Sequence, residues 1–129
     1  MKAPNDFFYI RNKDQDAADL LRRWAIWLGR NPSSPYYTRV SYFLGGVGGG
    51  DFSDDEGLLI DRFMADIKAR QPHLYRVLRM SYLERKSNRA IAVILKCRHD
   101  AVGEMLRLGE ARIDEKIHSW REGILSKNT

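Results

Sequence analysis

Residues 87–113 read SNRAIAVILKCRHDAVGEMLRLGEARI, and their apolar residues fall on two helical stripes separated by a short polar step. The stripes consist of Ile91, Ala92 and Leu95 and of Val102, Leu106, Gly109 and Ile113. Spacings of three and four residues keep side chains on one face of a helix. Because residues 96–99 suffice only for a tight turn, the pattern predicts a helix-turn-helix whose second helix can enter a DNA major groove. The alternative is a plain helical hairpin in an all-α core.

Length and composition indicate one globular unit. The chain has 129 residues, of which 43% are hydrophobic and 30% charged, as is ordinary for a compact domain with a real core. Its single cysteine cannot form an internal disulfide or a Cys-rich zinc site. The start, MKAPNDFFYI, lacks the apolar core of a signal peptide, and no apolar run approaches the roughly 20 residues that span a bilayer. We therefore expect a cytoplasmic protein that needs neither a membrane nor a cofactor.

Positive charge is concentrated in one part of the chain. The net charge is +5, and residues 68–98 alone hold nine basic residues and one acid, Glu84. The basic residues are Lys68, Arg70, Arg76, Arg79, Arg85, Lys86, Arg89, Lys96 and Arg98. Such a block attracts polyanions, and phosphate contacts dominate nucleic-acid affinity. A solvated basic face is the simpler alternative, but the block runs directly into the predicted helix-turn-helix and so favours nucleic acid.

The first half of the chain predicts one long helix flanked by less regular segments. Residues 1–15 form an N-terminal segment whose apolar cluster at residues 7–10 should pack without forming an element of its own. Asp16 can cap a helix whose buried stripe is Ala17, Leu20, Leu21, Trp24 and Leu28, and the prolines of NPSSP, residues 31–35, end it. Residues 36–43 predict a loop with at most a helical turn. The glycines of residues 44–52 predict a flexible loop.

The second half predicts three further helical segments. Ser53 and Glu56 form a capping box for a helix that runs to about Arg70. Pro72 opens the next helix, with Leu74, Tyr75, Leu78 and Tyr82 on its buried stripe. The helix-turn-helix region, residues 86–120, follows, with small Ala92 and Gly109 expected where its helices approach most closely and a last helix extending through Ile117 and Trp120. The predicted fold is all-α: a small single-domain helical protein, residues 1–129, with a C-terminal helix-turn-helix and a flexible Gly-rich loop after the first helix.

Catalytic patterns are weak. His73, His99 and His118 lie on three different segments, and no nucleophile is paired with a base at a recognisable spacing. Cys97 lies in a basic turn that could lower its pKa and make it a nucleophile, but partial burial within the motif is the simpler expectation. We therefore expect that the protein is not an enzyme and holds no metal.

Three segments together resemble one known family. They are LRRWAIW at residues 21–27, SDDEGLLID at residues 53–61, and the helix-turn-helix, whose Ser87, Ile91, Ala92, Val102 and Leu106 pattern is also shared with sigma-factor region four. From about Leu20 to Trp120 the layout resembles the late-gene antiterminators of lambdoid phages and prophages, the Q proteins, in the family that includes the phage 21 protein. The resemblance implies a small helical protein that binds double-stranded DNA at a late-promoter element, engages host bacterial RNA polymerase and promotes read-through of pauses and terminators.

The resemblance also implies a set of DNA-binding residues. The positions that match the reading surface are Arg98, His99, Asp100, Ala101, Gly103, Glu104 and Arg107. Lys86 and Arg89 would hold backbone phosphates and fix the register, and Lys96 belongs to the same set. For the polymerase-binding face, the candidates are an exposed Trp27, the aromatic segment near Tyr36 and Tyr37, and the N-terminal cluster. A sigma factor and a second copy of the chain on DNA stay open as further partners.

The chain departs from the family's pattern on the predicted recognition helix. Arg98 stands where a Ser or Thr cap is usual, and Gly103 and Glu104 follow Val102 where basic residues are usual. Residues 100–116 hold five acids and three bases, so the positive charge precedes the recognition helix. Phosphate contacts from the preceding helices would then supply most of the affinity. The alternative is a module that binds RNA polymerase or another protein and modulates transcription without reading DNA.

Overall fold

The computed structural model describes residues 7–44 and 52–127 of the chain, and these residues form helices and turns without a strand. The elements are α1 (Phe8–Arg11), α2 (Ala17–Leu28), α3 (Arg39–Leu44), α4 (Asp54–Arg70), α5 (Pro72–Leu78), the π-helical segment η1 (Arg79–Leu83), α6 (Asn88–Leu95) and α7 (His99–Lys127). The predicted all-α, small single-domain fold is confirmed. Most of the predicted Gly-rich loop, residues 45–51, lies outside the described residues, as do residues 1–6 of the predicted N-terminal segment.

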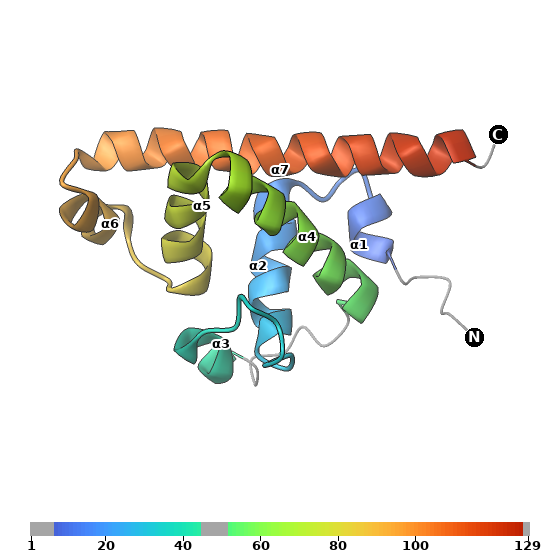
Figure 1. Cartoon of the computed structure of the whole chain (residues 1–129), viewed down its shortest axis with the longest axis horizontal. Coiled ribbons are helices and arrows are strands. Elements are labelled where there is room, and N and C mark those ends of the chain that lie inside the picture. The colour runs from blue at the N-terminus through green and yellow to red at the C-terminus, as the bar shows by residue number, and fades with distance from the viewer. Residues whose placement is uncertain (1–6, 45–51, 128–129) are drawn as a thin grey trace.

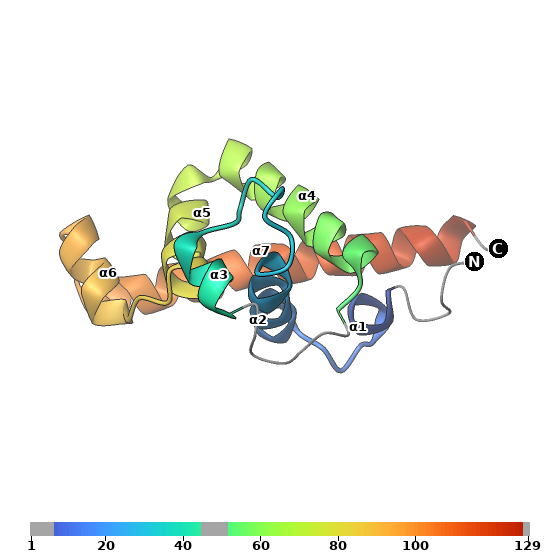
Figure 2. The same ribbon diagram turned by 90° about the horizontal axis from the view of Figure 1, so that it is seen from below.

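The long helix α7 is the frame on which the other helices are arranged (Figure 1). It contacts α2, α4, α5 and α6, while α3 packs on α2. Figures 1 and 2 both show α6 at one end of the molecule, beside the start of α7, and α1 near the opposite end. The first half of α7 therefore lies against α5 and α6, and its second half lies against the N-terminal part of the chain.

The predicted stripe of α2 is confirmed. Asp16 caps the helix by accepting the backbone N–H of Asp19 at 3.0 Å. The stripe residues Ala17, Leu20, Leu21, Trp24 and Leu28 are at most 1% exposed. They join side chains from α4, α5 and α7 in the main hydrophobic core. Hydrophobic burial of this kind is the dominant favourable term in folding.

The predicted capping box of α4 is also confirmed, and its glutamate has a second role. The hydroxyl of Ser53 accepts the N–H of Glu56 at 3.1 Å, and the Glu56 carboxylate accepts the N–H of Ser53 at 3.2 Å. The other oxygen of this buried carboxylate accepts the N–H groups of Tyr9 and Ile10 at 2.8 and 3.0 Å. Glu56 thus ties α1 to α4, 46 residues away in the sequence.

Two expected loops are helical. The N-terminal cluster forms α1, because Glu56 accepts its first N–H groups while the Arg121 guanidinium donates to the carbonyls of Ile10 and Asn12. A short helix gains from negative charge at its start and positive charge at its end. Residues 39–44 form α3, more than the single turn expected there. Thr38 and Ser41 bond each other's backbone N–H groups, and the Thr38 hydroxyl donates to the carbonyl of Leu83.

The sequence predicted that Gly109 lies at the closest approach of α6 and α7, and this prediction is wrong. A Cβ at Gly109 would lie 2.9 Å from Cγ of Leu78, so the glycine admits α5 rather than α6. The extension of the last helix through Ile117 and Trp120 is confirmed, with Ile117 buried and the Trp120 ring in tilted contact with Phe7 at 5.0 Å between ring centroids.

Candidate nucleic-acid interface

The helix pair predicted around residues 96–99 consists of α6 and the first turns of α7. Ser87 caps α6 by accepting the N–H of Ala90 at 3.1 Å. At the other end, Lys96 adopts the left-handed conformation, and the N–H of Cys97 donates to the carbonyl of Ala92 at 3.0 Å. A left-handed residue at this point ends a helix and reverses the chain direction. α7 then begins at His99, so the connection has only three residues.

A small second hydrophobic cluster holds this pair to the rest of the protein. Its buried members are Val77, Met80, Ile91, Ala92 and Val102, with Leu95, Met105 and Leu106 packed against them. Ile91 and Val102 have no exposed surface, which agrees with the stripes predicted for the two helices. The outer side of α6 is left uncovered among the described residues, with Val93 78% and Ile94 43% exposed.

An open groove lies on the outer side of the α6–α7 turn. Its lining residues come from α6, the turn and the first residue of α7: Arg89, Ala92, Val93, Lys96, Cys97, Arg98 and His99. Four of the predicted DNA-binding residues, Arg89, Lys96, Arg98 and His99, thus come together in one concavity. Cys97 is exposed there, which corrects the expected partial burial, because the Cys97 backbone rather than its side chain turns inward to close the helix.

The basic side chains around α6 differ in how they are paired. Within residues 7–44 and 52–127, Arg85, Arg89 and Lys96 have no acidic side chain at ion-pair distance. Arg98 reaches Asp100 only at 3.5 Å and is 86% exposed at its side chain. We call these four residues the α6 cations. Since three of them have no acidic partner among the described residues and the fourth has only the long contact to Asp100, they present a positive surface to solvent.

Lys86 is a weaker candidate than the sequence suggested. Its ammonium group lies 3.8 Å from the Glu84 carboxylate, which also pairs with Arg79 at 3.1 Å. Arg85, which the predicted set did not include, is more exposed and unpaired among the described residues. The basic block contained both residues, but the sequence did not indicate which of them would form an ion pair with Glu84.

The outer face of α7 is mixed rather than basic. Asp100, Glu104 and Arg107 are exposed, and Leu108 is 43% exposed. Asp100 lies beside the cations, with its carboxylate 3.1 Å from Nε2 of His99. Ala101 is half-buried, and a Cβ at Gly103 would lie 3.9 Å from the Asn88 amide nitrogen, so Gly103 faces α6. The predicted reading positions therefore do not all share one surface.

The residues suggested for a polymerase-binding face have different environments. The expectation that Trp27 is exposed is wrong. Its side chain is only 2% exposed, and its indole N–H donates to Asp54 at 3.0 Å. Tyr36 is buried against Trp24. Phe8 is 51% exposed, and the exposed pair Tyr42 and Phe43 lies on α3.

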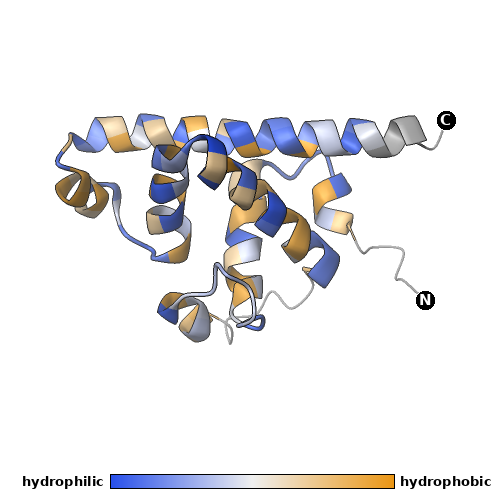
Figure 3. Cartoon of the chain, in the orientation of Figure 1, coloured by the Kyte–Doolittle hydropathy of each residue, from blue (hydrophilic) through white to orange (hydrophobic). Residues whose placement is uncertain are grey.

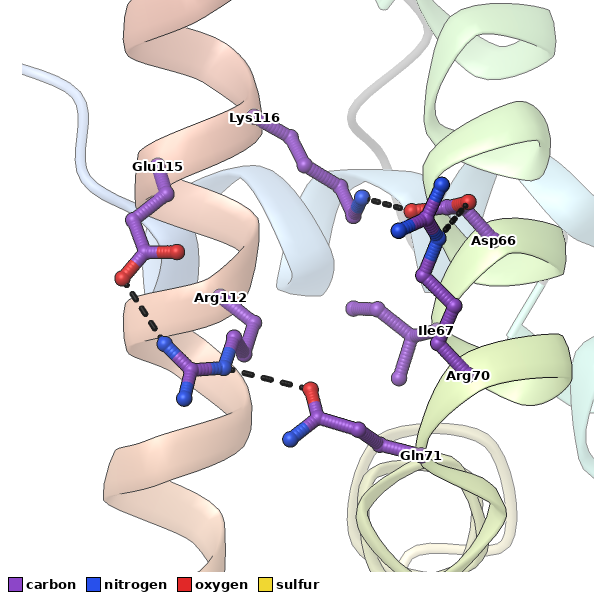
Figure 4. Close-up of a pocket in the computed structure, with 7 residues that line it drawn as sticks. All are labelled: Asp66, Ile67, Arg70, Gln71, Arg112, Glu115 and Lys116. Atoms are coloured by element: carbon purple, nitrogen blue, oxygen red, sulfur yellow. Dashed lines mark hydrogen bonds and ion pairs between the residues drawn. The ribbon is translucent and has the colours of Figure 1, made fainter.

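A separate polar cavity lies where α4, α5 and α7 meet (Figure 4). Its charged groups are paired: Lys116 and Arg70 both donate to Asp66, while Arg112 donates to Gln71 at 3.1 Å and to Glu115 at 2.8 Å. The hydrogen bond from Lys116 is the largest cause that lowers the pKa of Asp66 below its ordinary value, followed by the bond from Arg70. The cavity is a joint that orients α7 rather than a surface with unpaired charge.

Two further observations concern other kinds of site. Among the described residues, no cluster of three or more His, Cys, Asp or Glu side chains could hold a metal ion. No described helix combines the length and apolar character that crossing a membrane requires.

The comparison with protein families gives one match. A family model described as phage antitermination protein Q matches residues 14–122, which include every element from α2 to most of α7. No curated protein and no solved structure matches the chain significantly.

Proposed function

The chain belongs to the phage antitermination protein Q family, and from that premise we propose that it binds duplex DNA at a phage late promoter and engages host RNA polymerase there. Family membership supports a role in transcription antitermination, and this family consists of regulatory, non-enzymatic transcription factors. The protein would act in the cytoplasm of the bacterial host, where its template is transcribed. The observation that carries the DNA-binding part of the proposal is the set of α6 cations, which flank or line α6 without strong acidic partners among the described residues; Arg89, Lys96 and Arg98 line one groove.

In the proposed complex, the start of α7 enters the major groove, and Arg85, Arg89 and Lys96 contact the phosphates beside it. In helix-turn-helix proteins the second helix lies in the groove while the first crosses the backbone. Arg98, directly before the start of α7, and Arg107, further along α7, are the side chains suited to guanine edges. Asp100 and Glu104 would repel phosphate and could accept from the amino group of cytosine. Affinity then depends mainly on α6 and its flanks, and base reading mainly on Arg98 and Arg107.

Selection of bound fragments from a random duplex pool at physiological salt tests this function. Recovery of a sequence motif supports it, and the motif should be lost or relaxed when Arg98 and Arg107 are both changed to Ala. Arg62→Ala and Arg11→Ala together serve as the matched control, because both arginines are exposed and lie on α4 and α1, away from the groove. Binding without any recovered motif would contradict sequence-specific recognition.

A second candidate function is a protein-binding module that modulates RNA polymerase without reading DNA. It is favoured by the exposed apolar side chains Val93, Ile94 and Leu108 and by the acids on the outer face of α7. Exposed apolar residues beside a polar rim are common in protein interfaces. A direct complex with purified bacterial RNA polymerase that forms without DNA, and that is lost in Val93→Ser/Ile94→Ser but not in Arg98→Ala/Arg107→Ala, would support this candidate. A complex that forms only with promoter DNA supports the first.

A further inference from the structure

We infer that Arg85 and Lys96, one at each end of α6, form a pair of phosphate contacts through which α6 spans one major groove of duplex DNA. This inference rests on the proposed DNA-binding function and adds Arg85, which lies three residues before α6, to the residues expected at that interface. It also gives Lys96 a defined partner residue and a defined task. Together the two residues would position the start of α7 rather than read bases.

Both residues adopt a backbone conformation that long side chains rarely occupy. Arg85 has φ 58° and Lys96 has φ 56°, and they are the two non-glycine residues with positive φ in the part of the chain that the structure describes. Glycine, and to a lesser degree asparagine, are the usual residues at such positions because a Cβ crowds the following carbonyl. Helix-turn-helix turns often contain glycine for this reason. Here both positions carry long cations instead.

The turns require the backbone conformation but do not require the cations. At Lys96, the N–H groups of Lys96 and Cys97 close α6 onto the carbonyls of Val93 and Ala92. At Arg85, the neighbouring N–H groups of Glu84 and Lys86 bond the carbonyls of Arg79 and Met80. All of these are main-chain bonds that a glycine would preserve. Both side chains are exposed, and neither has an acidic partner among the described residues.

The separation of the two residues suits a groove. α6 has eight residues, which corresponds to a length of about 12 Å. The major groove of B-DNA is about 12 Å wide. Lys96 directly follows α6 and Arg85 lies three residues before it, so long side chains that flank such a helix can reach phosphates on the two sides of one groove. Arg89, Lys96 and Arg98 line the concavity beside this helix, and exposed Val93 lines it as well. The pairing of strained backbone with unpaired charge therefore points to a partner with two rows of phosphates.

Three double variants separate charge from backbone strain. Arg85→Gln/Lys96→Gln removes both charges and keeps a long side chain in each left-handed position. Arg85→Gly/Lys96→Gly removes the charges and relieves the strain. Arg85→Lys/Lys96→Arg keeps both charges. The control Arg11→Gln/Arg62→Gln removes two exposed cations far from α6.

Each variant is measured for binding to a fluorescent duplex of random sequence, from about 50 to about 200 mM salt, and for its melting temperature. The Gln and Gly variants should both bind on the order of tenfold more weakly, with the slope of log K against log salt reduced by about 2, because two phosphate contacts are lost. The Gly variant should melt at a higher temperature than the Gln variant. The charge-keeping variant and the control should bind like the unchanged protein.

Different outcomes overturn the inference and the function on which it rests. If the unchanged protein binds duplex but the Gln variant has the same affinity and salt slope, the paired contacts are wrong while DNA binding stands. If the Gln variant is less stable but binds normally, the cations serve only the adjacent helix ends, and the inference is again overturned. If the unchanged protein binds no duplex even at the lowest salt, the proposed DNA-binding function fails, and the inference fails with it.

Discussion

Helices α4 and α6 both begin with a serine cap, but the charged side chains around the two helices have different partners. Each has a serine cap that accepts a backbone N–H at 3.1 Å, Ser53 for α4 and Ser87 for α6. The first turn of α4 holds three acids, whereas the first turn of α6 holds none. In α4, Glu56 accepts the backbone N–H of Tyr9 and Asp54 accepts the indole N–H of Trp27. The α6 cations lie exposed instead, with at most the long contact of Arg98 to Asp100.

The difference separates stability from recognition within one small fold. At the start of α4, Glu56 and Asp54 accept donors from α1 and from Trp27, and Asp61 accepts the Trp24 indole N–H at 2.8 Å. Carboxylates that are hydrogen-bonded in this way, above all the buried Glu56, hold segments in one arrangement. α6 is instead held by a small hydrophobic cluster and leaves apolar and basic side chains exposed. In Figure 3 the α6 ribbon is coloured mostly as hydrophobic. We expect mutations to affect unfolding at the first region and binding at the second.

The largest contrast should come from changing glycine to alanine beside the start of each helix. Gly57 lies in the first turn of α4, and Gly103 of α7 faces Asn88 at the start of α6. In Gly57→Ala, the new Cβ would lie 2.2 Å from the ring of buried Trp27, so α4 and α2 must separate and the free energy of unfolding should fall by about 3 kcal/mol or more. In Gly103→Ala, the atom nearest to the new Cβ is 3.9 Å away. The better helix propensity of alanine should therefore raise the free energy of unfolding by about 0.5 to 1 kcal/mol. Urea unfolding measures both. Equal effects of the two changes would contradict the comparison.

Removing the Glu56 side chain should have the next largest effect. Glu56→Ala leaves the N–H groups of Tyr9, Ile10 and Ser53 without their acceptor, so the free energy of unfolding should fall by about 2 to 3 kcal/mol. Amide hydrogen exchange at Tyr9 and Ile10 should accelerate more than exchange in α5. Glu104→Ala, on the exposed face of α7, is the matched control and should leave unfolding nearly unchanged. Normal protection of α1 in Glu56→Ala would show that the α1–α4 tie is not needed.

A smaller effect should depend on pH at the joint between α4 and α7. Hydrogen bonds from Lys116 and Arg70 hold the pKa of Asp66 below its ordinary value of 3.8. The folded state therefore favours the ionised carboxylate, and its stabilising contribution is complete above that ordinary value and is lost as the pH falls through the folded-state pKa.

The difference in unfolding free energy between the unchanged protein and Asp66→Asn tests this dependence. It should be present at neutral pH and shrink as the solution becomes more acidic than the ordinary pKa of Asp66. Asp14→Asn, in an exposed loop, is the control and should not reproduce the neutral-pH difference. A difference that stays constant into strong acid would contradict the role of the two ion pairs.

The smallest effect on unfolding should come from the outer side of α6. Val93 is 78% exposed, so Val93→Ala should change the free energy of unfolding by no more than about 0.5 kcal/mol. Ile91→Ala, on the buried side of the same helix, should instead cost about 2 kcal/mol or more. Chemical denaturation of the two variants measures this contrast. A large cost for Val93→Ala would mean that the outer side of α6 is covered within the protein rather than free for a partner.

Local patterns were sufficient to predict much of the fold. The α2 stripe, the capping box of α4 and the long last helix depend on residues three or four positions apart, and the start of α5 depends on one proline. The structure contains each of these features. The basic block was also evident, because charge can be counted along the chain. The groove beside α6 brings together Arg89, Lys96, Arg98 and His99, four members of the set that the family resemblance implied.

The tertiary structure decided which of these side chains are available. Trp27 is buried because Gly57 and Asp54 of α4 receive it, Gly109 faces Leu78 rather than α6, and α1 forms because Glu56 and Arg121 bind its two ends. Glu84 lies nearer to Arg79 and Lys86, which leaves Arg85 unpaired among the described residues. The sequence by itself determined the longer helices and the sign of the charge, since both follow from neighbouring residues, whereas the short helices α1 and α3 depend on distant contacts. Which groups meet across the fold depends on contacts between residues tens of positions apart, and only the packed chain fixes those.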